Sequence, residues 1–149
     1  NRSIICNPSK LENIRLINST IKERDYWMPF SPTILDIDEK KYLYKKKNFE
    51  NNFMTCLFDS TDAAQKDLIC AIHPIDFTLR PQILKESQNP SYYNLISQFK
   101  EKTSIGAVLN TSFNLHGFPN VSSHEDAFTT FKKSNLEYLI IENFLIKKN

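Results

Sequence analysis

Glycine is scarce in this sequence, with only Gly106 and Gly117 among 149 residues. An average chain of this length would hold about 10. Walker-type phosphate loops and the dinucleotide-binding fingerprint both need clustered glycines, so the sequence excludes these classes, and it excludes a collagen-like repeat for the same reason. A phosphate site in this chain must therefore rely on side chains more than on a backbone cradle.

Paired cysteines, ligand-spaced histidines and long apolar runs are also absent from the sequence. The odd number of cysteines, with no CxxC pair, argues against a disulfide framework and predicts reduced thiols in a cytoplasmic protein. No apolar run reaches about 18 residues, so we expect no membrane span. The three histidines have no paired spacing and no HExxH motif is present, so we expect no metal ligands in this domain. A net charge of +2 makes a nucleic-acid partner unlikely on electrostatic grounds.

The composition, with 40% hydrophobic and 24% charged residues, is typical of a globular chain. The length predicts one domain over residues 1–149. The segments expected to be extended are 2–6, 33–37, 53–58, 68–72, 78–85, 105–109 and a terminal hairpin over 137–147. Helices are expected to begin at Asn7-Pro8, at Ser60 or Thr61, at Asn89-Pro90 and at a Ser122–Glu125 capping box. This interleaving favours an α/β fold, with α+β as the alternative, in which helices pack on a mixed sheet.

Two basic segments are candidates for binding an anion. Lys22 and Arg24 follow the first expected helix, where they either complement the helix dipole or grip phosphate oxygens. Arg80 precedes a proline that restrains its backbone. Asp76 and Thr78 lie close enough in sequence to orient Arg80 or to bind a hydroxyl, although Asp76 is also a common turn former.

A third segment, residues 107–119, places Asn, Thr, Ser, Phe and Asn at 110–114, after a buried strand. Ligands of α/β proteins collect at the carboxyl edge of the sheet. Hydroxyl and amide groups can bind phosphoryl oxygens or a carbamoyl amide without titrating. The alternative is a turn whose polar side chains cap its own backbone. We interpret Asn110, Ser112 and Asn114 as candidate ligand contacts.

Five blocks of the chain together resemble a known family. They are NRSI at 1–4, IKERDYWMPFSPTIL at 21–35, DFTLRPQ at 76–82, NPSYYNLISQF at 89–99 and LNTSFNLHGFP at 109–119. In order and spacing they resemble the C-terminal domain of NodU-type O-carbamoyltransferases. The resemblance implies a YrdC-like twisted sheet. It also implies that the chain, which opens at Asn1 without Met, is part of a longer protein whose N-terminal domain holds the acceptor and metal sites.

The same resemblance implies an enzymatic role. Such a domain binds carbamoyl phosphate and ATP with Mg²⁺ and forms carbamoyladenylate, which the N-terminal domain uses to carbamoylate a hydroxyl. By this resemblance the catalytic residues are Lys22, Arg80 and Ser112. The residues implied to bind substrate or nucleotide are Arg2, Arg24, Thr78, Asn110 and Asn114.

Three positions depart from the family pattern. Met28, Phe77 and Phe118 stand where the family usually reads Arg, Gly and Glu, in RPF, DGT and HGEP. Methionine cannot replace a guanidinium at a phosphate site. These departures leave open a non-catalytic nucleotide-binding or regulatory module. The YrdC-like resemblance leaves open a second alternative, an RNA-binding domain.

Overall fold

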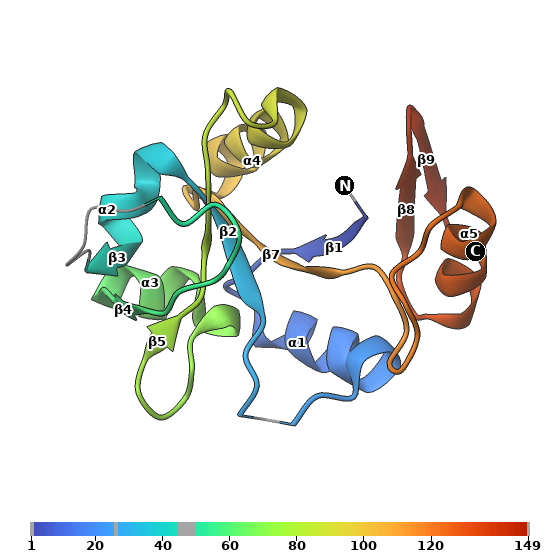
Figure 1. The fold of residues 1–149 in the computed structure, drawn as a ribbon, viewed down its shortest axis with the longest axis horizontal. Coiled ribbons are helices and arrows are strands. Elements are labelled where there is room, and N and C mark those ends of the chain that lie inside the picture. The colour runs from blue at the N-terminus through green and yellow to red at the C-terminus, as the bar shows by residue number, and fades with distance from the viewer. Residues whose placement is uncertain (1, 26, 45–49, 149) are drawn as a thin grey trace.

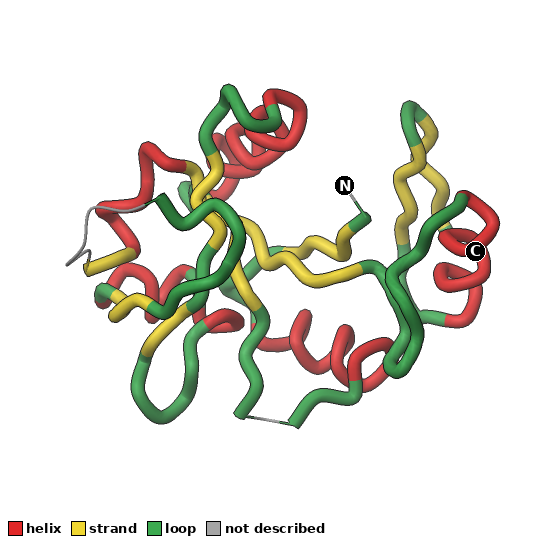
Figure 2. The backbone as a smooth tube through the Cα atoms, in the orientation of Figure 1, coloured by secondary structure: helices red, strands yellow, loops and turns green. Residues whose placement is uncertain are grey.

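The computed structural model describes residues 2–25, 27–44 and 50–148. Figures 1 and 2 show how its helices and strands are arranged. The strands are β1 (Ser3–Cys6), β2 (Ser31–Leu35), β3 (Leu43–Tyr44), β4 (Phe58–Ser60), β5 (Thr78–Leu79), β6 (Gln82–Leu84), β7 (Ala107–Ser112), β8 (Tyr138–Ile141) and β9 (Phe144–Lys147). The α-helices are α1 (Leu11–Ile17), α2 (Glu39–Tyr42), α3 (Asp62–Asp67), α4 (Pro90–Thr103) and α5 (His124–Lys133). The structure also contains one π-helical turn, η1 (Asn18–Lys22), and two 3₁₀ turns, η2 (Asp36–Asp38) and η3 (Ile69–Ala71), among the described residues.

A four-stranded mixed sheet forms the centre, in the order β1-β7-β2-β6. Strand β7 is antiparallel to both β1 and β2, and β6 is parallel to β2. Helix α4 lies on one side of this sheet and α1 on the other (Figure 1). Successive β7 residues accordingly enter different clusters: Val108 packs with Ile96 of α4, whereas Leu109 packs with Ile17 and Phe131. The predicted α/β class, with helices packed on a mixed sheet, is confirmed.

Local sequence signals set the start of the longest helix. The Asn89 side chain accepts a hydrogen bond from the Tyr92 amide at 3.1 Å, and Pro90 occupies the first helical turn, as the sequence predicted. Helix α5 begins one residue later than expected, because Ser123 and Asp126 form the capping box. The Asp126 carboxylate also accepts from the Ser122 amide and hydroxyl, which fixes this register.

Several predicted strands differ from the structure, and segment 78–85 divides into β5 and β6, which belong to different sheets. Only Phe58 of segment 53–58 is in a strand, and segment 68–72 forms the 3₁₀ turn η3. A short buried apolar run fits a strand or a helical turn equally well, and here the Ala71 amide bonds to the Leu68 carbonyl at 2.8 Å. Strand β7 continues past the predicted end at 109 to Ser112, which pairs with Ser3 of β1.

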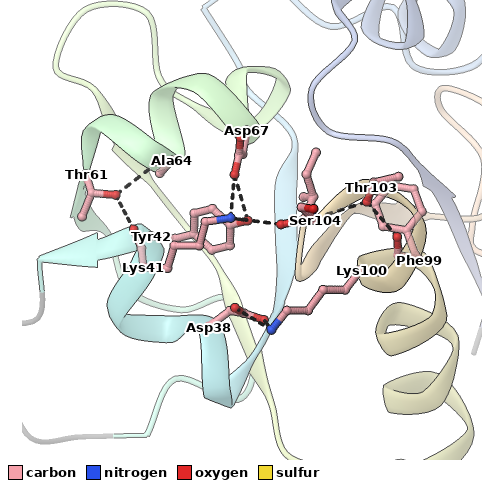
Figure 3. A network of polar contacts seen from close by, with 11 residues as sticks. Asp38, Lys41, Tyr42, Thr61, Ala64, Asp67, Phe99, Lys100, Thr103 and Ser104 are labelled. Atoms are coloured by element: carbon pink, nitrogen blue, oxygen red, sulfur yellow. Dashed lines mark hydrogen bonds and ion pairs between the residues drawn. The ribbon is translucent and has the colours of Figure 1, made fainter.

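Smaller units flank the central sheet. Strands β3, β4 and β5 form a second sheet, and β8 and β9 form the predicted hairpin, which stands beside α5 in Figure 2. Figure 3 shows two ion pairs between neighbouring elements: Lys41 of α2 pairs with Asp67 of α3 at 2.8 Å, and Lys100 of α4 pairs with the buried Asp38 of η2 at 2.7 Å. In the three described ranges, no helix is both long and apolar enough to cross a membrane.

Candidate functional site

The side chain of Lys22 lies at the centre of a polar cluster. It comes from the end of η1 and is only 5% exposed. Its Nζ donates to Ser112 Oγ at 3.0 Å and to Asn114 Oδ1 at 2.7 Å, and the Ser112 hydroxyl donates to the same Asn114 oxygen at 2.5 Å. An ammonium group has three N–H donors. Residues of β7 and the turn after it engage two of these donors, and no hydrogen bond among the described residues occupies the third.

The orientation of Asn114 is fixed by its own turn. Its Nδ2 donates to the carbonyls of Leu115 at 3.0 Å and Phe118 at 2.8 Å, so its Oδ1 faces Lys22. Gly117 has φ of +75° in this turn, a conformation that favours glycine. The turn therefore presents an acceptor to the ammonium group without using a charged side chain.

Arg24 and Arg80 add two further positive charges near Lys22. The Arg24 guanidinium stacks on the Phe30 ring at 4.8 Å from its centroid, and Arg80 Nη2 donates to Ser31 Oγ at 3.3 Å. Burial, and then the charge of Arg24, lowers the pKa of Lys22 to about 8. Burial, and then the charge of Arg80, lowers the pKa of Arg24. Arg24 therefore lies near both of the other cations.

Carboxylates do not neutralise this basic cluster of Lys22, Arg24 and Arg80. Among the described residues, none of the ion pairs includes any of its three members. Cations held near one another repel, and an anion bound between them relieves that repulsion. The arrangement suits a phosphate or another polyoxyanion.

A ladder of neutral polar side chains crosses the sheet beside the basic cluster. Asn110 pairs in register with Ser31 and donates through Nδ2 to Thr33 Oγ1 at 3.0 Å. The Thr33 hydroxyl in turn donates to Gln82 Oε1 at 3.0 Å. The ladder joins β7, β2 and β6 on the α4 side of the sheet, because these positions alternate with the residues packed against α1.

A groove of about 560 Å³ adjoins this ladder. Its lining is neutral and rich in amides, with two aromatic rings: Ser3, Asn52, Phe53, Gln82, Leu84, Gln88, Asn89, Tyr92 and Asn110. Such a lining suits a neutral, ring-containing group that both donates and accepts hydrogen bonds. Across the described ranges, no cluster of three or more His, Cys, Asp or Glu side chains could hold a metal ion.

Two predicted site residues lie outside the basic cluster. Arg2 donates through Nη1 to the Val121 carbonyl at 2.9 Å, which ties β1 to the segment before α5. The Thr78 hydroxyl donates to Asp76 Oδ1 at 2.7 Å within its own turn. Neither side chain contacts Lys22 or Arg80 through a hydrogen bond that the structure records for the described residues. The other six predicted residues form the basic cluster, hydrogen-bond to its Lys22 or lie on the ladder: Lys22, Arg24 and Arg80, then Ser112 and Asn114, then Asn110.

Sequence reasoning missed two residues that hold the segment 22–24. Asn18 brackets Arg24: its Nδ2 donates to the Arg24 carbonyl at 2.6 Å, and its Oδ1 accepts from the Arg24 amide at 2.7 Å. His116 Nδ1 donates to the Lys22 carbonyl at 2.7 Å. Both side chains bond to main-chain atoms. Because every residue has these atoms, the sequence does not indicate such contacts. The single available clue was that His116 lies within the third polar segment.

The three departures from the family pattern leave the contacts of Lys22 intact. Phe77 has φ of +57°, so the backbone keeps the left-handed conformation that glycine favours at this position. Phe118 is 63% exposed, and only its carbonyl contacts Asn114. Met28 is 40% exposed and lines a separate groove with Phe30 and Phe77. The departures therefore alter the surroundings of the basic cluster, while the side chains that hold Lys22 are unchanged.

Comparisons with known proteins agree on one family. A family model described as "Carbamoyltransferase C-terminus" matches residues 1–148. The uncharacterized protein MJ1058 of Methanocaldococcus jannaschii is 40% identical over 148 residues, which cover 99% of this chain and 24% of that protein. The nodulation protein NolO of Bradyrhizobium diazoefficiens is 34% identical, covering 99% and 27%. A 3'-hydroxymethylcephem-O-carbamoyltransferase of Amycolatopsis lactamdurans is 28% identical, covering 78% and 21%. The chain thus spans about a quarter of the length of the curated relatives it matches.

Proposed function

This chain belongs to the carbamoyltransferase C-terminus family, and from that premise we propose that it binds carbamoyl phosphate and ATP and joins them as carbamoyladenylate. The observation that carries the proposal is the buried ammonium group of Lys22, held by Ser112 and Asn114 beside two arginines. Both reactants are polyanions that repel each other. Fixed cations and neutral donors bring them together and offset that repulsion.

The proposed reaction has two steps. Water first cleaves the P–O bond of carbamoyl phosphate, which releases phosphate and leaves carbamate. A carbamate oxygen then bonds to the α-phosphorus of ATP as the bond to the β-phosphate oxygen breaks and pyrophosphate leaves. ATP enters with its Mg²⁺ as part of the substrate. Lys22, Arg24 and Arg80 stabilise charge on the phosphoryl oxygens, and Ser112 orients them.

The neutral groove next to the ladder provides a place for the nucleoside. The described residues that line it are all uncharged, whereas Ser31, which pairs with Asn110 of the groove, accepts a hydrogen bond from Arg80 of the basic cluster. A nucleotide placed with its phosphates on the cations would put its base and ribose against amides and aromatic rings. In this arrangement Asn110 contacts the boundary between the phosphate and nucleoside parts of the ligand.

The acceptor lies outside this domain in the proposal. The relatives extend over about four times the matched length, and one of them is named for carbamoylation of a hydroxymethyl group. We infer that a further domain of the complete protein takes the carbamoyl group to a hydroxyl. In this proposal, the side chains that bind the acceptor belong to that further domain.

Loss of Arg80 or Ser112 tests the proposal. We expect Arg80→Ala and Ser112→Ala each to lower carbamoyl-phosphate-dependent ATP–pyrophosphate exchange in the complete protein by about 10- to 100-fold, because each removes one donor to developing charge. Arg15→Ala and Ser97→Ala, at α-helical positions away from the cluster, serve as matched controls. Wild-type exchange in both site variants would refute the assignment. Tight ATP binding by a wild-type protein without exchange would instead support a non-catalytic nucleotide-binding module.

The pKa of Lys22 predicts how anion binding depends on pH. Burial lowers this pKa to about 8, so the ammonium group is charged below pH 8 and loses its proton above it. Sulfate does not titrate in this range and is a suitable probe. We expect sulfate affinity to fall above pH 8, approaching about tenfold per pH unit if neutral Lys22 does not bind. Calorimetric titrations from pH 7 to 9.5 measure the effect. The same series with Lys22→Met should be nearly flat, and an equally steep decline in that variant would assign the titration to another group.

A further inference from the structure

The backbone that carries Lys22 has an unusual local conformation. Residues Asn18–Lys22 form a π-helical turn, and Glu23 ends it with φ of +47°, a conformation uncommon for a residue other than glycine. The Glu23 amide bonds to the Asn18 carbonyl at 2.8 Å. Single π-helical turns and left-handed residues persist where surrounding contacts impose them, frequently at functional sites. The conformation of residues 18–23 therefore depends on contacts from other parts of the chain.

His116 supplies two of those contacts. Its backbone amide donates to the Ile21 carbonyl at 2.7 Å, and its Nδ1 lies 2.7 Å from the Lys22 carbonyl. A carbonyl oxygen only accepts hydrogen bonds, so Nδ1 carries the proton.

One turn therefore holds Lys22 at both ends. Asn114 accepts from the ammonium group, and His116, two residues later, donates to the carbonyl of the same lysine. The bonds from Asn114 to the carbonyls of Leu115 and Phe118 fix the turn internally. Lys22 has a long, flexible side chain, and holding its backbone removes freedom that would otherwise let the ammonium group leave Ser112 and Asn114 for solvent.

We propose that His116 is a positioning residue: by holding the Lys22 carbonyl, its Nδ1–H keeps the lysine ammonium group on Ser112 and Asn114, with one N–H directed to the bound anion. The inference deepens the proposed function and rests on it only for the identity of that anion. His116 does not contact the reactants in this role. Its effect passes through Lys22 alone.

Two amide substitutions separate positioning from general packing. The side-chain amide of Asn lies where Nδ1 of histidine lies, whereas that of Gln lies nearer to Nε2. We expect His116→Asn to retain the bond to Lys22 and to bind sulfate within about twofold of wild type, and His116→Gln to bind it on the order of 10-fold more weakly, since small misplacements of a binding group have large effects. His124→Gln, an exposed histidine of α5, is the matched control.

The direct readout is the pKa of Lys22, measured by NMR on lysine labelled at Cε and Nζ. In His116→Gln the ammonium group should leave its buried position, and its pKa should rise from about 8 toward 10.5. His116→Asn should keep the wild-type value. Equal pKa and sulfate affinity in both variants would overturn the positioning role, whether they resemble wild type or are equally impaired. A raised pKa in His116→Gln, together with a wild-type protein that shows no carbamoyl-phosphate-dependent exchange, would support the positioning role and refute the proposed function, so the two failures are distinguishable.

Discussion

Replacing Lys22 with methionine will lower carbamoyl-phosphate-dependent ATP–pyrophosphate exchange on the order of 10³-fold, the upper range for losing one preorganised donor. Methionine has a similar length and is apolar, so it fills the buried position without supplying a charge. Ser112 and Asn114 keep their mutual hydrogen bond but lose the donor that orients them toward the phosphoryl group. The basic cluster would be reduced to its two arginines.

The same substitution should not destabilise the fold. The Lys22 ammonium group is buried beside Arg24, and both effects lower its pKa, which means that the folded state disfavours this charge. We therefore expect the melting temperature of Lys22→Met at pH 7 to equal or exceed that of wild type. Lys40→Met, at an exposed position of α2, is the control for loss of a lysine. Exchange near the wild-type rate in Lys22→Met would remove Lys22 from the proposed mechanism.

Lys22→Arg makes the test more specific. It keeps a positive charge but replaces a compact ammonium group with a wider, planar guanidinium. The two acceptors, Ser112 Oγ and Asn114 Oδ1, are hydrogen-bonded to each other, so the space between them and the lysine backbone fits a single nitrogen atom. We infer that charge alone will not restore exchange at this site, since geometry and charge are both required.

Much of the fold follows from local sequence signals. Helix α4 begins at the predicted Asn89-Pro90, and the terminal hairpin lies where its two apolar runs indicate. The predictions of secondary structure were wrong where contacts between distant segments determine the conformation. Segment 68–72 has the apolar composition of a buried strand but forms a 3₁₀ turn, because the Cys70 amide bonds to the distant Pro8 carbonyl. Strand β7 extends to Ser112 because β1 pairs with it there, and polar residues by themselves predicted a turn.

The candidate site was predictable in composition but not in geometry. Residue types selected Lys22, Ser112 and Asn114, yet the contact between them joins positions about 90 residues apart, which no local pattern encodes. Arg2 was selected for the same charge as Lys22, but its guanidinium bonds a backbone carbonyl instead. The role of His116 could not be predicted, because no sequence pattern indicates that its ring nitrogen bonds to the main-chain carbonyl of Lys22.

Gly106 carries the largest expected effect on stability. A Cβ added there would lie 1.8 Å from Asp38 Oδ2 and 2.5 Å from its Cγ, distances that real atoms do not adopt. Asp38 cannot move aside freely, because it is buried and paired with Lys100 of α4, as Figure 3 shows. We expect Gly106→Ala to lower the free energy of unfolding by about 2–3 kcal/mol, through overpacking and disruption of this ion pair.

A double-mutant cycle with Asp38→Ala identifies the cause. If steric conflict with the Asp38 carboxylate produces the loss, Gly106→Ala should cost only about 1 kcal/mol in the Asp38→Ala background, where the approach to Cβ at 3.1 Å remains. Urea denaturation of the four proteins would then show a strong coupling. Additive losses would instead place the cost elsewhere. Gly117 provides the contrast, because a Cβ there meets nothing within 4 Å while its φ is +75°. Gly117→Ala should cost about 1–2 kcal/mol from conformation alone, whether or not Asp38 is present. The two glycines of the chain are thus required for separate reasons: Gly106 for space beside an ion pair, and Gly117 for the backbone of the turn that holds Lys22.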